Sequence, residues 1–433
     1  MAKSHLLMWG LILSGSSLFA ACSSDITING GGGAGEAGAS DEAGAGNSAG
    51  SAGAGEAGTG EGGEAGVVDP TPPAPLNPQS VVIPSAGPTT STQLLVAASD
   101  FSAGKSEVVS LTIGTGVVGK GATYEDGDAI AVSSAGVGFT IERTNDKVHL
   151  LDAGKISTTF DLKDPGTDTA PVDSKAYVPV LGQSFISVLD LTELKVSRRI
   201  DLSEFDDASD SDHSVDASEG VYDSNKNIVY FLLQRIDRNS YDASFNLPCS
   251  TVKGLIVGID AATDKVVDLN GEKAGKGIEL QLVNGRSLSI NADGDTAYLL
   301  ADGCYEGKTK KNRGVEVVDL TNATSMVQYA DETTNYLAQM ILTGGSEALI
   351  QYSDENYATH WTKLDIAAGT LQGELDGVPS AVSFDGTDLL GVEVTDKVGA
   401  VVRYKLATGK TTVISDTSWA GQYSSAASTA LVQ

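Results

Sequence analysis

Past residue 80 the chain repeats one arrangement of hydrophobic and polar positions. An alternating apolar strand ends at an acidic residue, a short polar turn follows, and a second apolar strand begins; two degenerate copies have Thr112 and Ala407 in place of the acidic residue. The clearest copy, residues 185–200, ends its first strand at Asp190, and residues 255–267 repeat the arrangement around Asp260. The equivalent positions are Thr112, Asp152, Asp190, Asp260, Asp319, Asp365 and Ala407. A repeat of about 40 residues has the length of a unit of four short strands, so seven copies predict seven such units.

A four-stranded sheet cannot bury both of its faces alone, whereas sheets packed around a ring bury both faces and leave only short edges. We therefore expect an all-β fold, a seven-bladed β-propeller. Residues 129–132 and 380–384 are predicted inner strands, and residues 291–295 and 385–388 are predicted hairpin turns in which glycine supplies a positive φ. Two β-sandwiches in tandem are the alternative, because strand spacing alone does not exclude them.

The repeats between about residues 92 and 415 resemble the YVTN-type repeats of seven-bladed bacterial surface propellers. We expect the propeller domain to span residues 80–433. Closing such a ring pairs a strand from one chain end with the blade at the other end. Two segments fit this role, residues 81–83 and residues 429–432, and the sequence leaves both open.

The first 22 residues have the features of an export signal: Lys3, a short apolar run over residues 6–13, and small residues before Cys22. The run is too short to span a bilayer, which needs about 20 residues. Cys22 follows two alanines, an arrangement that resembles the lipobox of bacterial lipoproteins. The resemblance implies removal of residues 1–21, acylation of Cys22 with fatty chains such as palmitate, and, because Ser23 follows, sorting to the outer membrane. An ordinary secretory signal with an incidental cysteine is the alternative.

Residues 22–79 are predicted to be a disordered tether. Residues 29–66 are almost entirely Gly, Ala, Ser and Glu, which offer little surface to bury, and the acidic side chains repel one another. A flexible segment of this kind has an r.m.s. span of about 35 Å. The proline-rich residues 69–78 stiffen its end. Such a tether behind a lipobox resembles those of myxobacterial lipoproteins.

The charge of the chain excludes one class of partner. The 57 acidic residues outnumber the 28 basic ones, for a formal charge of −29. Nucleic acid is not expected as a partner, because phosphate neutralisation needs clustered Lys and Arg. Anionic lipid headgroups would also repel the protein, so a hold on the membrane has to be covalent or hydrophobic, as a lipid at Cys22 provides.

Two cysteines besides Cys22 are present, Cys249 and Cys304. Both lie shortly before equivalent strands of adjacent repeats, which brings them close together, and an exported protein favours a disulfide. The bridge would contribute about 4 kcal/mol by chain entropy. A metal or catalytic thiol is the alternative, but no CxxC or CxxCH motif is present.

A cation site is predicted in the acidic segment 204–219. Carboxylates at alternate positions supply the hard oxygen ligands that Ca²⁺ prefers. The candidate ligands are Asp206, Asp207, Asp210 and Asp212. The segment lacks the glycine and the terminal glutamate of an EF-hand loop, and a solvated acidic loop is the alternative.

A ligand-binding surface is predicted in the two insertions that lengthen the spacing between repeats. Both insertions are locally basic and carry tyrosines on an otherwise acidic protein. The candidate residues are Arg235, Arg238, Tyr241, Tyr305, Lys308, Lys310, Lys311 and Arg313. Solubilising loops are the alternative.

No nucleophile elbow, zinc-protease motif, phosphate loop or haem-attachment motif is present. His149, His213 and His360 fall in different repeats, and His149 and His360 are predicted to be partly exposed strand residues. We therefore expect a cell-envelope lipoprotein at the outer membrane, on its periplasmic side or its surface. It would bind an envelope protein, a polysaccharide or a small ligand. The alternatives are a lactonase-like hydrolase with a metal in the central channel, and capture of a metal chelate for an outer-membrane transporter.

Overall fold

The computed structural model describes residues 93–100, 103–119, 121–134, 136–152, 155–244, 246–249, 252–271, 275–333, 335–344, 346–356, 358–395, 398–415, 419–420 and 425–432. The predicted signal peptide (1–21), the predicted tether (22–79) and residues 81–83 lie outside this part. Within the described part, no helix combines the length and hydropathy needed to cross a membrane.

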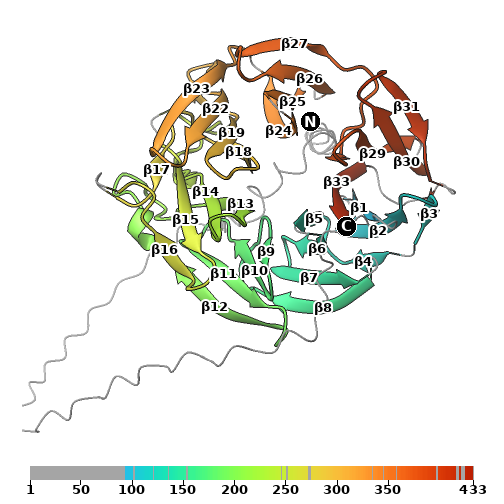
Figure 1. Ribbon diagram of the computed structural model, residues 1–433, viewed down its shortest axis with the longest axis horizontal. Coiled ribbons are helices and arrows are strands. Elements are labelled where there is room, and N and C mark those ends of the chain that lie inside the picture. The colour runs from blue at the N-terminus through green and yellow to red at the C-terminus, as the bar shows by residue number, and fades with distance from the viewer. Residues whose placement is uncertain are drawn as a thin grey trace, which may run out of the picture. The chain divides into compact units, whose positions relative to one another are not determined.

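Within the described residues, seven antiparallel sheets are arranged as the blades of a ring, and a separate two-stranded hairpin lies beside them (Figure 1). From the inside outward, blade 1 contains β33 (Ser425–Val432), β1 (Gln93–Asp100), β2 (Lys105–Thr112) and β3 (Val117–Val118); blade 2, β5 (Ala129–Ser134), β6 (Val137–Glu142), β7 (Lys147–Asp152) and β8 (Lys155–Asp161); blade 3, β9 (Ala170–Val172), β10 (Lys175–Pro179), β11 (Phe185–Asp190) and β12 (Lys195–Asp201).

The other blades repeat this order. Blade 4 contains β13 (Ala217–Asp223), β14 (Ile228–Leu233), β15 (Leu255–Asp260) and β16 (Lys265–Val267); blade 5, β18 (Gly285–Ile290), β19 (Thr296–Ala301), β22 (Gly314–Asp319) and β23 (Thr324–Ala330); blade 6, β24 (Tyr336–Gly344), β25 (Glu347–Ser353), β26 (Thr359–Asp365) and β27 (Thr370–Glu374); blade 7, β28 (Val382–Phe384), β29 (Leu389–Thr395), β30 (Val398–Lys405) and β31 (Lys410–Val413). Short strands add to three blades: β4 (Ala122–Tyr124) to β2, β17 (Ile278–Glu279) to β15, and β32 (Trp419–Ala420) to β30.

An apolar core fills each of the seven junctions between consecutive blades. Alternation along β14 shows how one strand serves two cores. Phe231 and Leu233 pack against blade 3, whereas Tyr230 and Leu232 pack against blade 5. Successive side chains point to opposite faces of a sheet, so a continuous apolar strand buries both faces only between two neighbours. The seven-bladed propeller is therefore confirmed over the alternative of two sandwiches.

The C-terminal strand closes the ring. β33 pairs antiparallel with β1 from Gln93↔Val432 to Ser99↔Ser425, with a bulge at Ala97/Ala98. Of the two closing segments that the sequence left open, the structure uses residues 429–432. The pairing covers the edge that a separate first blade would expose.

The repeated polar positions lie where the pattern places them. Thr112, Asp152, Asp190, Asp260, Asp319 and Asp365 each end the third strand of a blade, and Ala407 lies two residues beyond β30. Asp190 Oδ1 accepts hydrogen bonds from the backbone N–H groups of Thr192 (2.8 Å) and Glu193 (2.7 Å). Such a carboxylate holds the turn to the outermost strand.

The two predicted hairpin turns are also confirmed. Residues 291–295 connect β18 to β19, with Gly294 at φ +71°, and residues 385–388 connect β28 to β29, with Gly386 at φ +91°. The predicted inner strands 129–132 and 380–384 correspond to β5 and to the segment around β28, the first strands of their blades.

Candidate functional site

The predicted cation-binding and ligand-binding residues lie in three connections on the same face of the ring. In an antiparallel blade, the loop from the second to the third strand and the loop to the next blade leave the sheet at the same end. Residues 202–216 join blade 3 to blade 4, and residues 234–254 and 302–313 join the second and third strands of blades 4 and 5. We call the described residues of these three connections the cap.

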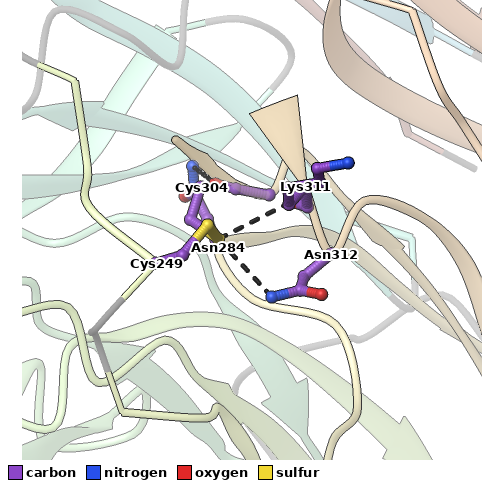
Figure 2. The surroundings of a disulfide bond; sticks show 6 residues. Cys249, Asn284, Cys304, Lys311 and Asn312 are labelled. Carbon is purple, nitrogen blue, oxygen red and sulfur yellow. Dashed lines mark hydrogen bonds between the residues drawn. A yellow bond between two sulfur atoms is a disulfide. The ribbon is translucent and has the colours of Figure 1, made fainter. Parts of the chain in front are cut away.

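The two insertions of the cap are joined by the disulfide between Cys249 and Cys304, whose Cα atoms lie 4.9 Å apart (Figure 2). Backbone hydrogen bonds run beside it: Tyr305 N–H donates to Leu247 O (2.7 Å) and Cys249 N–H donates to Tyr305 O (3.1 Å). Ile236, Leu247, Val283 and Cys304 form a small buried core at this point. The predicted bridge between equivalent insertions of adjacent blades is confirmed.

A hairpin of β20 (Cys304–Glu306) and β21 (Thr309–Lys311) carries four of the predicted ligand-binding residues. Lys308 and Lys311 are exposed, Tyr305 is half-buried, and Lys310 is buried. Lys310 Nζ lies 2.9 Å from both carboxylate oxygens of Asp302 and 3.8 Å from the centre of the Tyr336 ring. Burial lowers the pKa of Lys310 to about 8, an effect that the Asp302 carboxylate opposes.

Arg313, which follows the hairpin, is also enclosed. Its Nη2 lies 3.0 Å from Asp331 Oδ2, and its Nη1 donates to Thr333 O (2.9 Å). Asp302, the partner of Lys310, accepts in addition from Leu337 N–H on blade 6 (2.8 Å). Lys310 and Arg313 therefore hold blade 5 to its neighbour, and Lys308 and Lys311 are the members of the predicted basic set in this hairpin that face solvent.

The basic insertion of blade 4 contacts the acidic segment. Arg235 Nη2 lies 3.1 Å from Asp207 Oδ2, and Arg238 Nη2 lies 2.7 Å from Asp216 Oδ1. Asp216 is fully buried. Tyr241, from the same insertion, is half-buried beside the disulfide core. Two residues of the predicted basic set, Arg235 and Arg238, thus form one network of opposite charges with the acidic segment.

A candidate cation site lies within this network. One carboxylate oxygen each of Asp210, Asp212 and Asp237 lies within 4.8 Å of the others. Burial and the neighbouring Asp212 charge raise the pKa of Asp210 to about 6. Carboxylate oxygens in this number suit Ca²⁺, with further ligands from backbone or water.

The outcome for the four predicted cation ligands is divided. Asp210 and Asp212 lie in the three-carboxylate group, whereas Asp206 pairs with His213 and Asp207 pairs with Arg235. Asp237 was not among the predicted ligands, because it comes from the insertion of blade 4 and only folding brings it to the acidic segment. A search for acidic residues in both insertions could have found it.

Three charged residues on or next to the innermost strands carried no sequence signal. Asp168 lies two residues before β9, Glu219 lies in β13 and Arg286 lies in β18; all three are partly exposed. Burial raises the pKa of Asp168 to about 6. Burial and the negative charge of Asp168 raise the pKa of Glu219 to about 8, whereas Arg286 lowers it.

The histidines lie apart from the cap, except for His213. His149 is 4% exposed, so the prediction of a partly exposed strand residue is wrong for it. Its Nε2 lies 2.5 Å from Glu142 Oε1 and its Nδ1 lies 2.8 Å from Thr159 Oγ1, contacts that satisfy a buried imidazole. His360 is partly exposed, as predicted, and stacks on Tyr352.

Comparisons with known proteins identify the fold and no family. No family model matches the sequence, and no curated protein matches it. A provisionally named 6-phosphogluconolactonase from Bacteroides fragilis superposes with a TM-score of 0.52 at 13% identity, over 81% of this chain and 100% of that one. One from Bacteroides uniformis gives 0.51 at 11%, over 79% and 100%. The β-propeller domain of Cps50 (Swd1) from Myceliophteria thermophila gives 0.45 at 14%, over 76% and 98%.

Identities this low show a shared fold and nothing about activity. The seven blades define the chain as a seven-bladed β-propeller protein.

Proposed function

We propose that this protein is a lipid-anchored binding module of the cell envelope, and that the cap is its binding surface. The proposal rests on the cap, because a blade of the ring can be built without such long connections. The equivalent second-to-third strand connections of the other blades have at most five residues; they are 101–104, 143–146, 180–184, 354–358 and 396–397. A long loop with its own small core and disulfide is typical of a recognition element.

The cap is also preorganised. Its arginines are held by buried or half-buried carboxylates, and its two insertions are joined covalently. A surface that is already rigid loses little conformational entropy when it binds, so more of the contact energy appears as affinity. The exposed Lys308 and Lys311 beside the half-buried Tyr305 suit an anionic or carbohydrate group on an envelope protein, a polysaccharide or a small ligand.

The proposed anchor comes from the sequence. Cys22 follows a lipobox-like segment, and the predicted tether of residues 22–79 would separate the propeller from the membrane. A repeat resembling the YVTN type suits a surface location. Replacing Cys22 with Ala should move the protein from the membrane fraction to the soluble fraction and remove the mass of the acyl chains. Membrane retention of C22A would contradict the anchor.

Crosslinking on intact envelopes tests the binding surface. The full chain should capture a defined envelope component, and the double substitution K308S/K311S should weaken that capture at least about tenfold. Lys265 and Lys410 are exposed lysines that begin the outermost strands β16 and β31, on the face opposite the cap. The charge-matched control K265S/K410S should leave capture unchanged. Equal loss in both variants would point to net charge and contradict the cap.

A lactonase-like hydrolase is the second candidate, because Asp168, just before β9, and Glu219 of β13 place two carboxyl groups on neighbouring blades, with pKa values of about 6 and about 8. Carboxyl groups on either side of neutrality can serve as base and acid. Elemental analysis and lactone hydrolysis by the purified full chain test it. Turnover that E219Q abolishes would favour the hydrolase, and bound metal without turnover would favour capture of a metal chelate.

A further inference from the structure

Hydrogen bonds link the innermost strands of consecutive blades. At four junctions among the described residues, a backbone N–H of one innermost strand donates to a side-chain oxygen of the preceding blade. The pairs are Ala131 with Ser428 Oγ (2.7 Å), Gly220 with Asp168 Oδ2 (3.0 Å), Leu288 with Glu219 Oε2 (2.6 Å) and Met340 with Ser287 Oγ (3.2 Å). These bonds satisfy backbone groups that face the centre of the ring.

The four acceptors differ in charge. Ser428 and Ser287 show that a neutral hydroxyl is sufficient for the bond. The two carboxyl groups instead accept the hydrogen bonds at the two junctions of blade 4. Asp168 accepts at the junction with blade 3, and Glu219 accepts at the junction with blade 5. An ionised carboxylate that is partly removed from water costs desolvation energy that a hydroxyl does not. The charge at blade 4 is therefore not needed to close the ring.

The two carboxyl groups also lie close to each other. Asp168 accepts a hydrogen bond from the backbone N–H of Gly220, the residue that follows Glu219. The charged groups on the neighbouring elements are few. Arg286 on β18 faces Glu219. Lys310 lies near Arg286, and its charge is neutralised by Asp302. On the other elements packed against β13, Lys175 of β10 is paired with Asp264, and Asp223 ends β13 itself, where its Oδ1 accepts from Asn225 N–H.

We propose that Asp168 and Glu219 form a proton-sensitive joint that holds blade 4 firmly when the carboxyl groups are protonated and loosens it when both are ionised. A protonated carboxyl group still offers its carbonyl oxygen to the backbone N–H. Ionisation adds two negative charges at one place in the ring, against the single positive charge of Arg286.

The direction of the effect follows from the pKa values, which burial raises to about 6 for Asp168 and about 8 for Glu219. Both lie above the values of the unfolded chain, so the folded state binds more protons. The stabilisation that these two carboxyl groups give the folded state is complete below about pH 4, where they are protonated in the folded and in the unfolded chain. It is lost as the pH rises through about 6 and then about 8.

The joint bears on the cap, because blade 4 carries residues 234–254 between β14 and β15 and the disulfide connects this insertion to blade 5. A looser blade 4 increases the mobility of the insertion. We infer that binding by the cap weakens as the pH rises through this range; this part rests on the proposed function, whereas the joint itself does not.

Hydrogen exchange of the full chain, followed by mass spectrometry, tests the joint. Peptides from β13 and β18 are compared with peptides from β29 in the same sample, which removes the intrinsic dependence of exchange on pH. We expect the protection of β13 and β18, relative to β29, to fall about tenfold between about pH 6 and about pH 9. E219Q keeps an acceptor oxygen and loses the titration near pH 8, so it should flatten this dependence. D168N keeps an acceptor oxygen and removes the charge that helps to raise the pKa of Glu219, so it should move the fall in protection to lower pH.

S287A is the matched control, because it removes a neutral acceptor at the next junction. It should lower the protection of β24 by the same factor at every pH. A wild-type ratio that does not change with pH, or an E219Q slope equal to that of the wild type, would overturn the joint. Neither readout needs a binding partner, so failure of the joint is distinguishable from failure of the proposed function.

Infrared titration of the wild type keeps the test valid if E219Q does not fold. A protonated carboxyl band should persist at neutral pH and disappear between about pH 7 and about pH 9. The absence of any carboxyl band above about pH 6.5 would overturn the proposal, because an ordinary glutamate is fully ionised there.

Discussion

The ring and the cap are stabilised in different ways. The junctions of the ring are apolar, with residues such as Phe231 and Leu299 fully buried between blades. The cap depends on a disulfide and on ion pairs, such as that between Arg238 and the buried Asp216, with only a small apolar core. Apolar contacts are non-directional and tolerate substitution by similar side chains, whereas buried charges require specific partners. The ring should therefore tolerate conservative change, and the cap should be specific.

The largest effect is expected in the ring. Phe231 is fully buried between blades 3 and 4, so F231A should destabilise the protein by about 3 to 5 kcal/mol. Met326 is 58% exposed on an outermost strand, and M326A should change the stability by less than about 0.5 kcal/mol. Denaturant unfolding measures both. A small loss in F231A would mean that the junction relaxes around the cavity.

The disulfide should matter next, and mainly in the cap. Replacing Cys249 and Cys304 with Ser together removes up to about 4 kcal/mol in the chain-entropy model. The ring should keep its far-ultraviolet circular dichroism, because its seven cores do not include the bridge. Limited proteolysis should cleave residues 234–254 first. If the double variant loses its β-sheet signal, the cap is part of the ring's stability and the comparison fails.

Calcium should stabilise the cap by an intermediate amount. Binding to Asp210, Asp212 and Asp237 at about 100 times the dissociation constant adds about 2.7 kcal/mol, which raises the melting temperature in millimolar Ca²⁺ over that in chelator. D237N should abolish the difference. D242N changes an exposed aspartate of the same insertion and should retain it. A melting temperature independent of Ca²⁺ would exclude the site.

Breaking one ion pair of the cap should have the smallest effect of the four. R238A leaves the buried Asp216 with its backbone donors Gly182 and Ile236 and without its cation. Because Arg238 is partly exposed, we expect a loss of about 2 kcal/mol. K308S removes an exposed lysine and should be neutral within about 0.5 kcal/mol. Equal stability of the two variants would show that the network is solvent-screened.

The fold could be predicted because its signal is local and repeated. Asp190 and its equivalents mark the same turn in each blade, and a repeated turn implies a repeated unit. The disulfide was predictable for the same reason, since Cys249 and Cys304 lie at equivalent positions of adjacent units. The choice of β33 for ring closure was not, because two segments had suitable patterns and only pairing with β1 distinguishes them.

The candidate sites were only partly predictable. Composition marked the acidic and the basic segments, and the structure shows that they neutralise each other through pairs such as Arg235 with Asp207. Side chains from different blades meet at distances that the sequence does not encode. Asp237, Asp168 and Glu219 lack any motif, and their importance comes from burial and from neighbours brought close by folding.

The repeated blade, its turns and the bridge between two insertions were predictable from the residues alone, because hydrophobic alternation and turn chemistry act between residues close in the chain. Which strand closes the ring, which charges are buried and paired, and which carboxyl groups meet near the centre of the ring depend on contacts between distant parts of the folded chain. Electrostatic energies depend on distance and solvent exposure, and the fold sets both.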